Sequence, residues 1–158
     1  MFTAETLARI IHISLVPITA TRHPLWSPTV ETILIMIAAH ESKMGRYLRQ
    51  IGGGPARGVF QIEPATMEDI YHSFINPRPK LARQIAEITG CDGPDLNHLA
   101  YNPMYGAILA RLKLYQSPGE IPTDTPLMAE YAKRYYNSPD GAATANDYLL
   151  AYYQTRNV

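Results

Sequence analysis

The sequence lacks the features that would tie it to a disulfide scaffold, a nucleic acid or a bilayer. It has one cysteine in 158 residues, Cys91, so no internal disulfide can form. Lysine plus arginine and aspartate plus glutamate number 14 each, so net charge gives no attraction to a polyanion and we expect no nucleic-acid partner. The most apolar run, 33–39, is far shorter than a bilayer requires, so we expect no membrane span.

Signals for secretion and for metal binding are missing as well. The first residues have neither a basic leader nor a continuous apolar segment, so we expect no signal peptide. His40-Glu41 could begin a zinc-protease helix, but that motif needs a second histidine where Met44 stands. The remaining histidines are isolated and show no metal-ligand spacing, so we expect no metal and no cofactor.

What the sequence does have is a globular composition, cut by prolines into helical segments. With 46% hydrophobic residues, the chain can form one domain with a core. Start and stop signals predict helices at about 4–15, 28–43, 64–73, 79–89, 102–115, 126–136 and 142–154. No long stretch alternates as a half-buried strand does, so the predicted fold class is mainly α, with at most a small β-hairpin near residues 54–62. We expect a single compact domain over 1–158, in which 4–15 is a packing helix.

Glu41 stands on the apolar face of the second predicted helix. Apolar residues recur there at spacings of three and four and continue to the glutamate: Val30, Ile33, Leu34, Ile37, Ala38 and Glu41. Burial raises the pKa of a carboxyl, and the helix C-terminus acts in the same direction, so the group could hold a proton as a general acid. The alternative is a frayed helix end, where Glu41 faces water or pairs with Arg46, Arg49 or Arg57.

Four segments, taken in chain order, match short motifs. They are His40-Glu41-Ser42, GPARGVFQIEPAT at 54–66, Asn102-Pro103 with Gly106, and Tyr135-Tyr136-Asn137. Together they resemble the soluble lytic transglycosylase and goose-type lysozyme family, especially its bacteriophage members. That family has Glu-Ser at a helix end, a Gly-x-x-Gln-Ile/Leu-x-Pro-x-Thr loop, an Asn/Asp-Pro helix and an Ala-Tyr-Asn segment.

The resemblance implies a lysozyme-like fold, with the catalytic part at about 28–153, and a role for each matching residue. Glu41 would be the acid, Ser42 would steady the acid or the sugar, and Gln61 would project from its loop into the cleft. Tyr136 and Asn137 would line the floor under the acid. The chain departs from the family pattern in its longer glycine-rich loop and after Asn137, where Ser-Pro-Asp-Gly replaces Ala-Gly.

The chemistry that the resemblance implies is cleavage of the β-1,4 bond between N-acetylmuramic acid and N-acetylglucosamine in peptidoglycan glycan strands. A conventional glycosidase adds a second carboxylate to the acid, and the candidates here are Glu63, Asp69 and Asp140. Glu63 directly precedes Pro64, where it would serve more simply as a helix cap. A lytic transglycosylase needs no second carboxylate, because its glutamate also takes the proton of the C6 hydroxyl as a 1,6-anhydro ring closes.

We therefore expect transglycosylase chemistry, with a hydrolytic lysozyme that produces reducing ends as the alternative. A second hypothesis is a non-catalytic virion or wall-binding module that keeps the lysozyme-like fold. Retention of Glu41 with Gln61 favours the enzyme, since a binding module could lose the acid without penalty. The resemblance further implies either a phage virion component, associated with particle proteins, or a protein of the host cytoplasm that another factor delivers to the cell wall.

Overall fold

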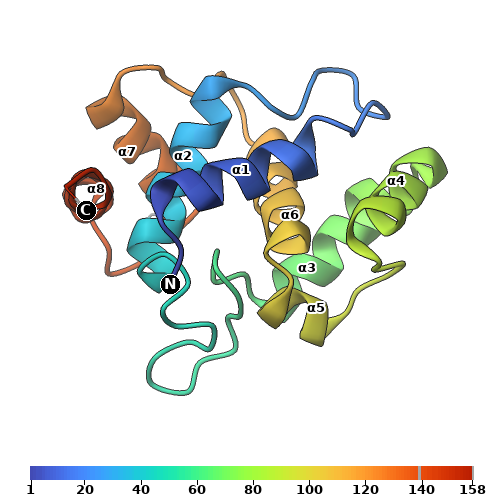
Figure 1. Cartoon of the computed structure of the whole chain (residues 1–158), viewed down its shortest axis with the longest axis horizontal. Coiled ribbons are helices and arrows are strands. Elements are labelled where there is room, and N and C mark those ends of the chain that lie inside the picture. Colours follow the sequence, from blue (N-terminus) through green and yellow to red (C-terminus); the bar gives the residue numbers. More distant parts are fainter. Residues whose placement is uncertain (139, 158) are drawn as a thin grey trace.

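The computed structural model of the chain describes residues 1–138 and 140–157, and it is built of helices joined by loops (Figure 1). The α-helices are α1 (Ala4–Leu15), α2 (Pro28–Ser42), α3 (Pro64–Ile70), α4 (Pro79–Thr89), α5 (Leu96–Tyr101), α6 (Pro103–Tyr115), α7 (Thr125–Tyr135) and α8 (Ala145–Thr155), and a π-helical segment, η1 (Tyr71–Ile75), follows α3. The expected mainly α class is confirmed. In the described part of the chain the only β pairing is two isolated bridges, Arg49 with Arg57 and Arg57 with Ile62, so the expected hairpin is reduced to a turn.

Several helices begin and end where local sequence signals place them. The Ser27 hydroxyl accepts a hydrogen bond from Val30 N (3.1 Å) at the start of α2, and α4 ends at Gly90 with φ +75. Sequence reasoning missed α5, a six-residue helix whose cap, Asp95, accepts from His98 N (2.8 Å). It has too few turns to show an apolar period, so only its cap could have revealed it.

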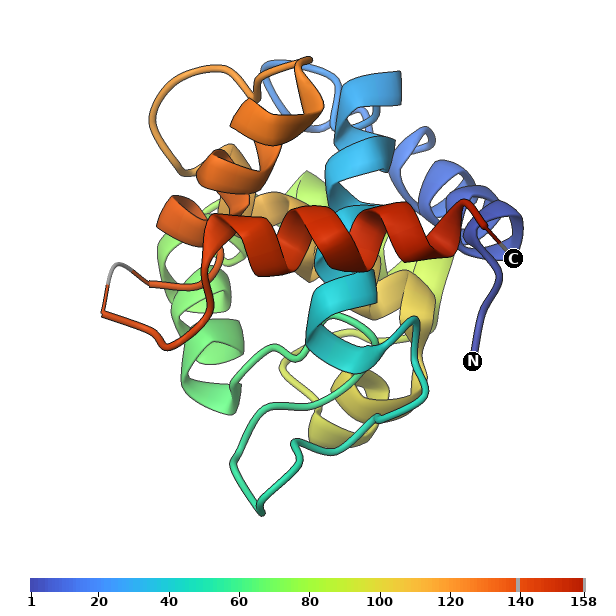
Figure 2. The same cartoon turned by 90° about the vertical axis from the view of Figure 1, so that its left-hand side faces the viewer.

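The helix that carries Glu41 is central and has no polar face. The apolar face expected from the sequence is buried, and burial extends beyond it to all residues of α2 from Ile33 to Ala39. Helices α1, α6, α7 and α8 all contact α2. Figure 2 shows α8, in red, crossing over it. Glu41 therefore meets solvent because it lies near the end of the helix.

The loop that follows α2 is held against the rest of the molecule by its backbone. Gly58 has φ +82, and a Cβ built on it would lie 2.2 Å from the carbonyl oxygen of Leu99. A glycine is required there for both reasons. The loop therefore lies against α5 and returns to α3 beside the end of α2. None of the helices that the structure describes combines the length and the apolar character needed to cross a membrane.

Candidate active site

A tyrosine of α8, which packs against α2, forms a hydrogen bond with the carboxyl of Glu41. Tyr148 Oη donates a short hydrogen bond to Glu41 Oε1, and the Glu41 side chain is mostly buried. Burial raises the pKa of this carboxyl above its ordinary value, while the Tyr148 hydrogen bond and the charges of His40 and Lys113 lower it by less. The net result is a carboxyl suited to keep its proton longer than an ordinary glutamate.

Tyr148 is the site residue that sequence reasoning missed. It is fully buried, and its ring stacks on that of His40 with centroids 4.1 Å apart. Burial, followed by the negative charge of Glu41, raises the pKa of its hydroxyl, so Tyr148 remains a neutral donor. The one signal available beforehand was general, since a buried tyrosine hydroxyl needs a hydrogen-bond partner.

Tyr136 and Asn137 follow directly on α7, and the charge of Glu41 acts on Tyr136. Tyr136 is 3% exposed, and its Oη donates to the carbonyl oxygen of Phe60 at 2.6 Å. Burial raises its pKa well above the ordinary value, and the charges of Glu41 and Tyr148 add to this. Asn137 Oδ1 accepts from Ser138 N (2.7 Å), and the Asn137 side chain acts to lower the pKa of the Tyr148 hydroxyl. Tyr136 is thus a buried support of the site that links α7 to the Gly58 loop.

Ser42 is placed to hold the end of α2. Its side chain is 0% exposed, and its hydroxyl lies 2.6 Å from Val59 O, to which it donates, while accepting from Gly45 N at 2.7 Å. A hydroxyl enclosed in this way does not reach a sugar. Of the two roles expected for Ser42, the contact with the sugar is therefore wrong, and the hydroxyl instead steadies the helix end that bears Glu41.

The side chain of Gln61, like that of Ser42, contacts backbone atoms and not the expected cleft. Its backbone has φ +47, an unusual conformation for a residue with a side chain. Its Nε2 donates to Gly58 O at 2.9 Å and to Tyr47 O at 3.2 Å, so the amide is turned back onto its own loop. The expected projection into a cleft is therefore not found, and the amide closes the turn that begins at Gly58.

Glu63 occupies the N-cap position of α3, but its side chain makes no cap hydrogen bond. The capping role expected for its carboxylate is therefore wrong. The side chain is exposed, and its charge acts on the ammonium of Lys113 together with that of Glu41. Glu63 thus lies on the same side of the molecule as the candidate acid, which keeps it a candidate second carboxylate.

The three arginines considered as partners of Glu41 make other contacts. Arg57 Nη1 donates to the carbonyl oxygens of Gly54 (2.8 Å) and Ala56 (2.9 Å). Arg49 Nη2 donates to Tyr101 Oη at 3.4 Å, and the Arg46 guanidinium lies 5.6 Å from the ring centroid of Tyr47. These contacts favour the buried interpretation of Glu41 over the frayed, arginine-paired one.

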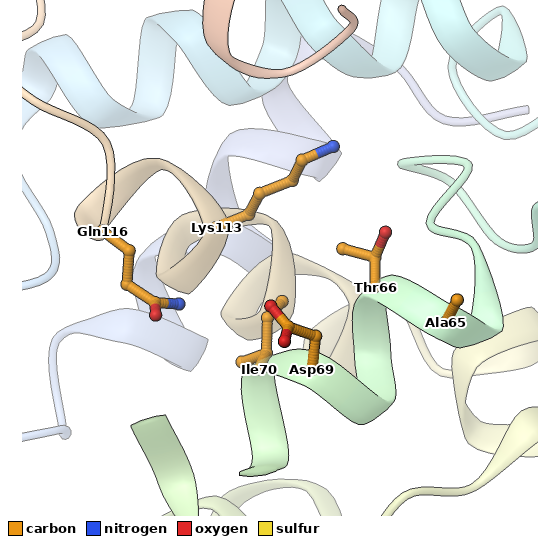
Figure 3. A pocket seen from close by; sticks show the side chains of 6 residues that line it. All are labelled: Ala65, Thr66, Asp69, Ile70, Lys113 and Gln116. Carbon is orange, nitrogen blue, oxygen red and sulfur yellow. The ribbon is translucent and has the colours of Figure 1, made fainter. Parts of the chain in front are cut away.

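An open groove of about 420 Å³ runs between α3 and α6 (Figure 3). Its lining residues are Ala65, Thr66, Asp69, Ile70, Lys113 and Gln116. Glu41 is not among them, but Lys113 lines the groove and its charge acts on Glu41, so this lysine connects the two. In Figure 3 the ammonium end of Lys113 points away from Asp69 and Gln116.

Within the described ranges, no three or more histidine, cysteine, aspartate or glutamate side chains gather as metal ligands would. Comparison of the chain with protein-family models, with curated proteins and with solved structures finds no match. The site itself therefore carries the functional conclusion: a mostly buried carboxyl with a raised pKa, and a groove nearby that Lys113 lines.

Proposed function

We propose that this chain is a peptidoglycan-cleaving glycosidase that acts on the β-1,4 bond between N-acetylmuramic acid and N-acetylglucosamine. The observation that carries the proposal is the state of Glu41, a carboxyl with a raised pKa that Tyr148 fixes at the end of a buried helix. Such a group can hold a proton near neutral pH and deliver it to the leaving oxygen of a glycoside. The lining of the groove between α3 and α6 includes hydroxyl, amide and charged side chains, which can bind a sugar residue of the glycan strand.

The chemistry that we propose uses this one carboxyl twice. As the bond from C1 of the muramoyl residue to O4 of the glucosamine residue breaks, Glu41 transfers its proton to O4. The resulting carboxylate then takes the proton of the C6 hydroxyl of the muramoyl residue, while O6 bonds to C1. The products are a strand with a free O4 hydroxyl and a 1,6-anhydromuramoyl end, and Glu41 is protonated again.

The test is the release of soluble fragments from purified peptidoglycan by wild type and by Glu41→Gln. Glutamine keeps the size of the side chain and can still accept the hydrogen bond of Tyr148. We expect a loss of about 10²- to 10⁴-fold, the usual contribution of a general acid. Glu68→Gln, which alters an exposed glutamate of α3, is the matched control and should keep wild-type activity. Equal release by wild type and Glu41→Gln would overturn the assignment of the acid.

The mass of the fragments separates the two kinds of glycosidase. An anhydro end is one water lighter than a reducing end, so mass spectrometry of the wild-type products distinguishes transglycosylase from lysozyme. The variant Glu63→Gln tests the second carboxylate. It should leave transglycosylase activity in place, whereas reducing ends together with a strong loss in Glu63→Gln would establish a two-carboxylate hydrolase.

A non-catalytic module is the second candidate, and it is favoured by one observation: Glu41 does not line the groove. Such a module would sediment with purified peptidoglycan and release no fragments. Its Glu41→Gln variant would bind peptidoglycan as well as wild type does. Its proposed setting is the virion, so it should co-purify with phage particles. An enzyme delivered from the host cytoplasm by another factor would instead be free of particles and release fragments.

A further inference from the structure

Lys113 lies in a segment of α6 whose buried residues are apolar except for Arg111. The helix is buried from Tyr105 to Leu112 and again at Leu114, and the Lys113 side chain is mostly buried between them. Burial lowers the pKa of the Lys113 ammonium, because keeping a charge at a buried position costs free energy. A leucine would pack more favourably, so this lysine requires an explanation.

The contacts of the ammonium hold it without neutralising it. Lys113 Nζ donates to the carbonyl oxygen of Tyr136 at 2.5 Å and lies 4.4 Å from the centroid of the Tyr136 ring. Both partners are neutral, because burial keeps the Tyr136 hydroxyl protonated. The carbonyl oxygen and the face of the ring each attract the ammonium weakly, and together they fix its position. The charge of Lys113 therefore remains available to groups nearby.

Those groups are carboxylates. The charges of Glu41 and Glu63 both stabilise the Lys113 ammonium, and that of Lys113 in turn lowers the pKa of Glu41. The other charged or titratable groups that act on Glu41 are His40 on its own helix, Tyr148 of α8 and Tyr136 after α7. The two tyrosines are neutral, whereas the charges of His40 and Lys113 both lower the pKa of Glu41, and Lys113 is the one that comes from another helix, α6.

We propose that Lys113 is a positioning residue for Glu41: Tyr136 holds its ammonium where the positive charge favours the carboxylate that Glu41 becomes after giving up its proton. The inference rests on the proposed function, in which one carboxyl acts first as an acid and then as a base. Burial alone would leave Glu41 a good acid and a poorly stabilised carboxylate. A fixed cation close by limits that imbalance, so the same group can perform both steps.

The experiment is an NMR titration of the Glu41 side-chain carboxyl carbon in ¹³C-labelled protein, assigned by its absence in Glu41→Gln. Lys113→Met removes the charge and keeps the stem. Lys113→Gln removes the charge but can still donate to Tyr136 O, so it serves if the methionine variant does not fold. In both we expect the Glu41 titration to move to higher pH. Lys113→Arg should stay at the wild-type midpoint.

The matched control is Lys43→Met, which removes an exposed lysine two residues from Glu41 in sequence. It should leave the Glu41 titration unchanged. In active protein, the alkaline limb of the kcat/KM profile should move upward with the NMR midpoint in the charge-removing variants, and not in Lys113→Arg. That correlated movement is not expected of a lysine that only stabilises the end of α7.

Two results separate failure of this inference from failure of the proposed function. If Lys113→Met lowers the melting temperature but titrates like wild type at Glu41, the lysine is structural and the inference is overturned. The NMR titration needs no turnover. If wild type cleaves no peptidoglycan while the Lys113 variants still shift Glu41, the coupling stands and the proposed reaction is overturned.

Discussion

Among the described residues, two clusters that contain buried tyrosines differ in the ionisable groups that surround them. The acid cluster joins Tyr136 and Tyr148 to Glu41 and Lys113. The phenol cluster is made of Tyr71, Tyr105 and Cys91: Tyr105 Oη lies 3.2 Å from both Tyr71 Oη and the carbonyl oxygen of Gly93, to which Cys91 Sγ donates at 3.0 Å. The phenol cluster contains only groups that stay neutral, whereas the acid cluster contains one carboxyl and one ammonium.

This difference separates structural burial from functional burial. Burial raises tyrosine pKa values in both clusters, to about 12 for Tyr71, and a neutral phenol that finds a partner costs little. Burying a carboxyl and an ammonium costs far more, and neither Glu41 nor Lys113 has the other as a hydrogen-bond partner in the contacts described. Perturbed ionisable groups of this kind are concentrated at functional sites.

The largest expected effect within the comparison comes from Tyr148→Phe. This variant removes the donor to Glu41 Oε1 and leaves the ring that stacks on His40. Loss of a hydrogen bond that orients the acid should reduce kcat/KM by about tenfold. Because that bond lowers the pKa of Glu41, the alkaline limb of the pH profile should also move to higher pH. Unchanged activity together with an unchanged profile would show that the acid cluster is as structural as the phenol cluster.

Tyr105→Phe makes the corresponding change in the phenol cluster. The ring, which is 0% exposed, remains in place, and only the hydroxyl contacts to Tyr71 and Gly93 are lost. We expect a decrease of about 1 kcal/mol in the free energy of unfolding, measured by denaturant titration, and no change in activity. A loss of activity without a loss of stability would erase the distinction between the two clusters.

The smallest effect is a pH-dependent gain in stability for Glu41→Gln. The folded state binds the Glu41 proton more tightly than the unfolded state does, because burial raises the pKa of the carboxyl. Wild type therefore loses stability as the pH rises from the ordinary glutamate pKa through the raised one. Glutamine does not titrate, so Glu41→Gln should be more stable than wild type at neutral pH, and the gap should close in acid. Unfolding curves at several pH values measure it, and a constant gap would contradict the raised pKa.

The fold could be predicted from the sequence to the extent that local signals define it. The Ser27-Pro28 start predicts where α2 begins, and the helix then runs to its end beside Glu41. The hydroxyl of Ser42 and the amide of Gln61 were placed in the right neighbourhood, but both turn onto backbone atoms. Which way a polar side chain turns depends on unpaired carbonyl and amide groups nearby, and a motif does not describe them.

By itself the sequence determined the helical class, the positions of most helices and the place of one glutamate at the end of an apolar segment. These properties follow from caps, prolines and composition, which act over a few residues. Only the tertiary structure decided that α2 is covered on every side, that Tyr148 bonds to Glu41, and that the charge of Lys113 acts on it. Tyr148 lies 107 positions further along the chain than Glu41, and a contact over such a separation arises from the packing of α2, α6 and α8, which no local pattern records.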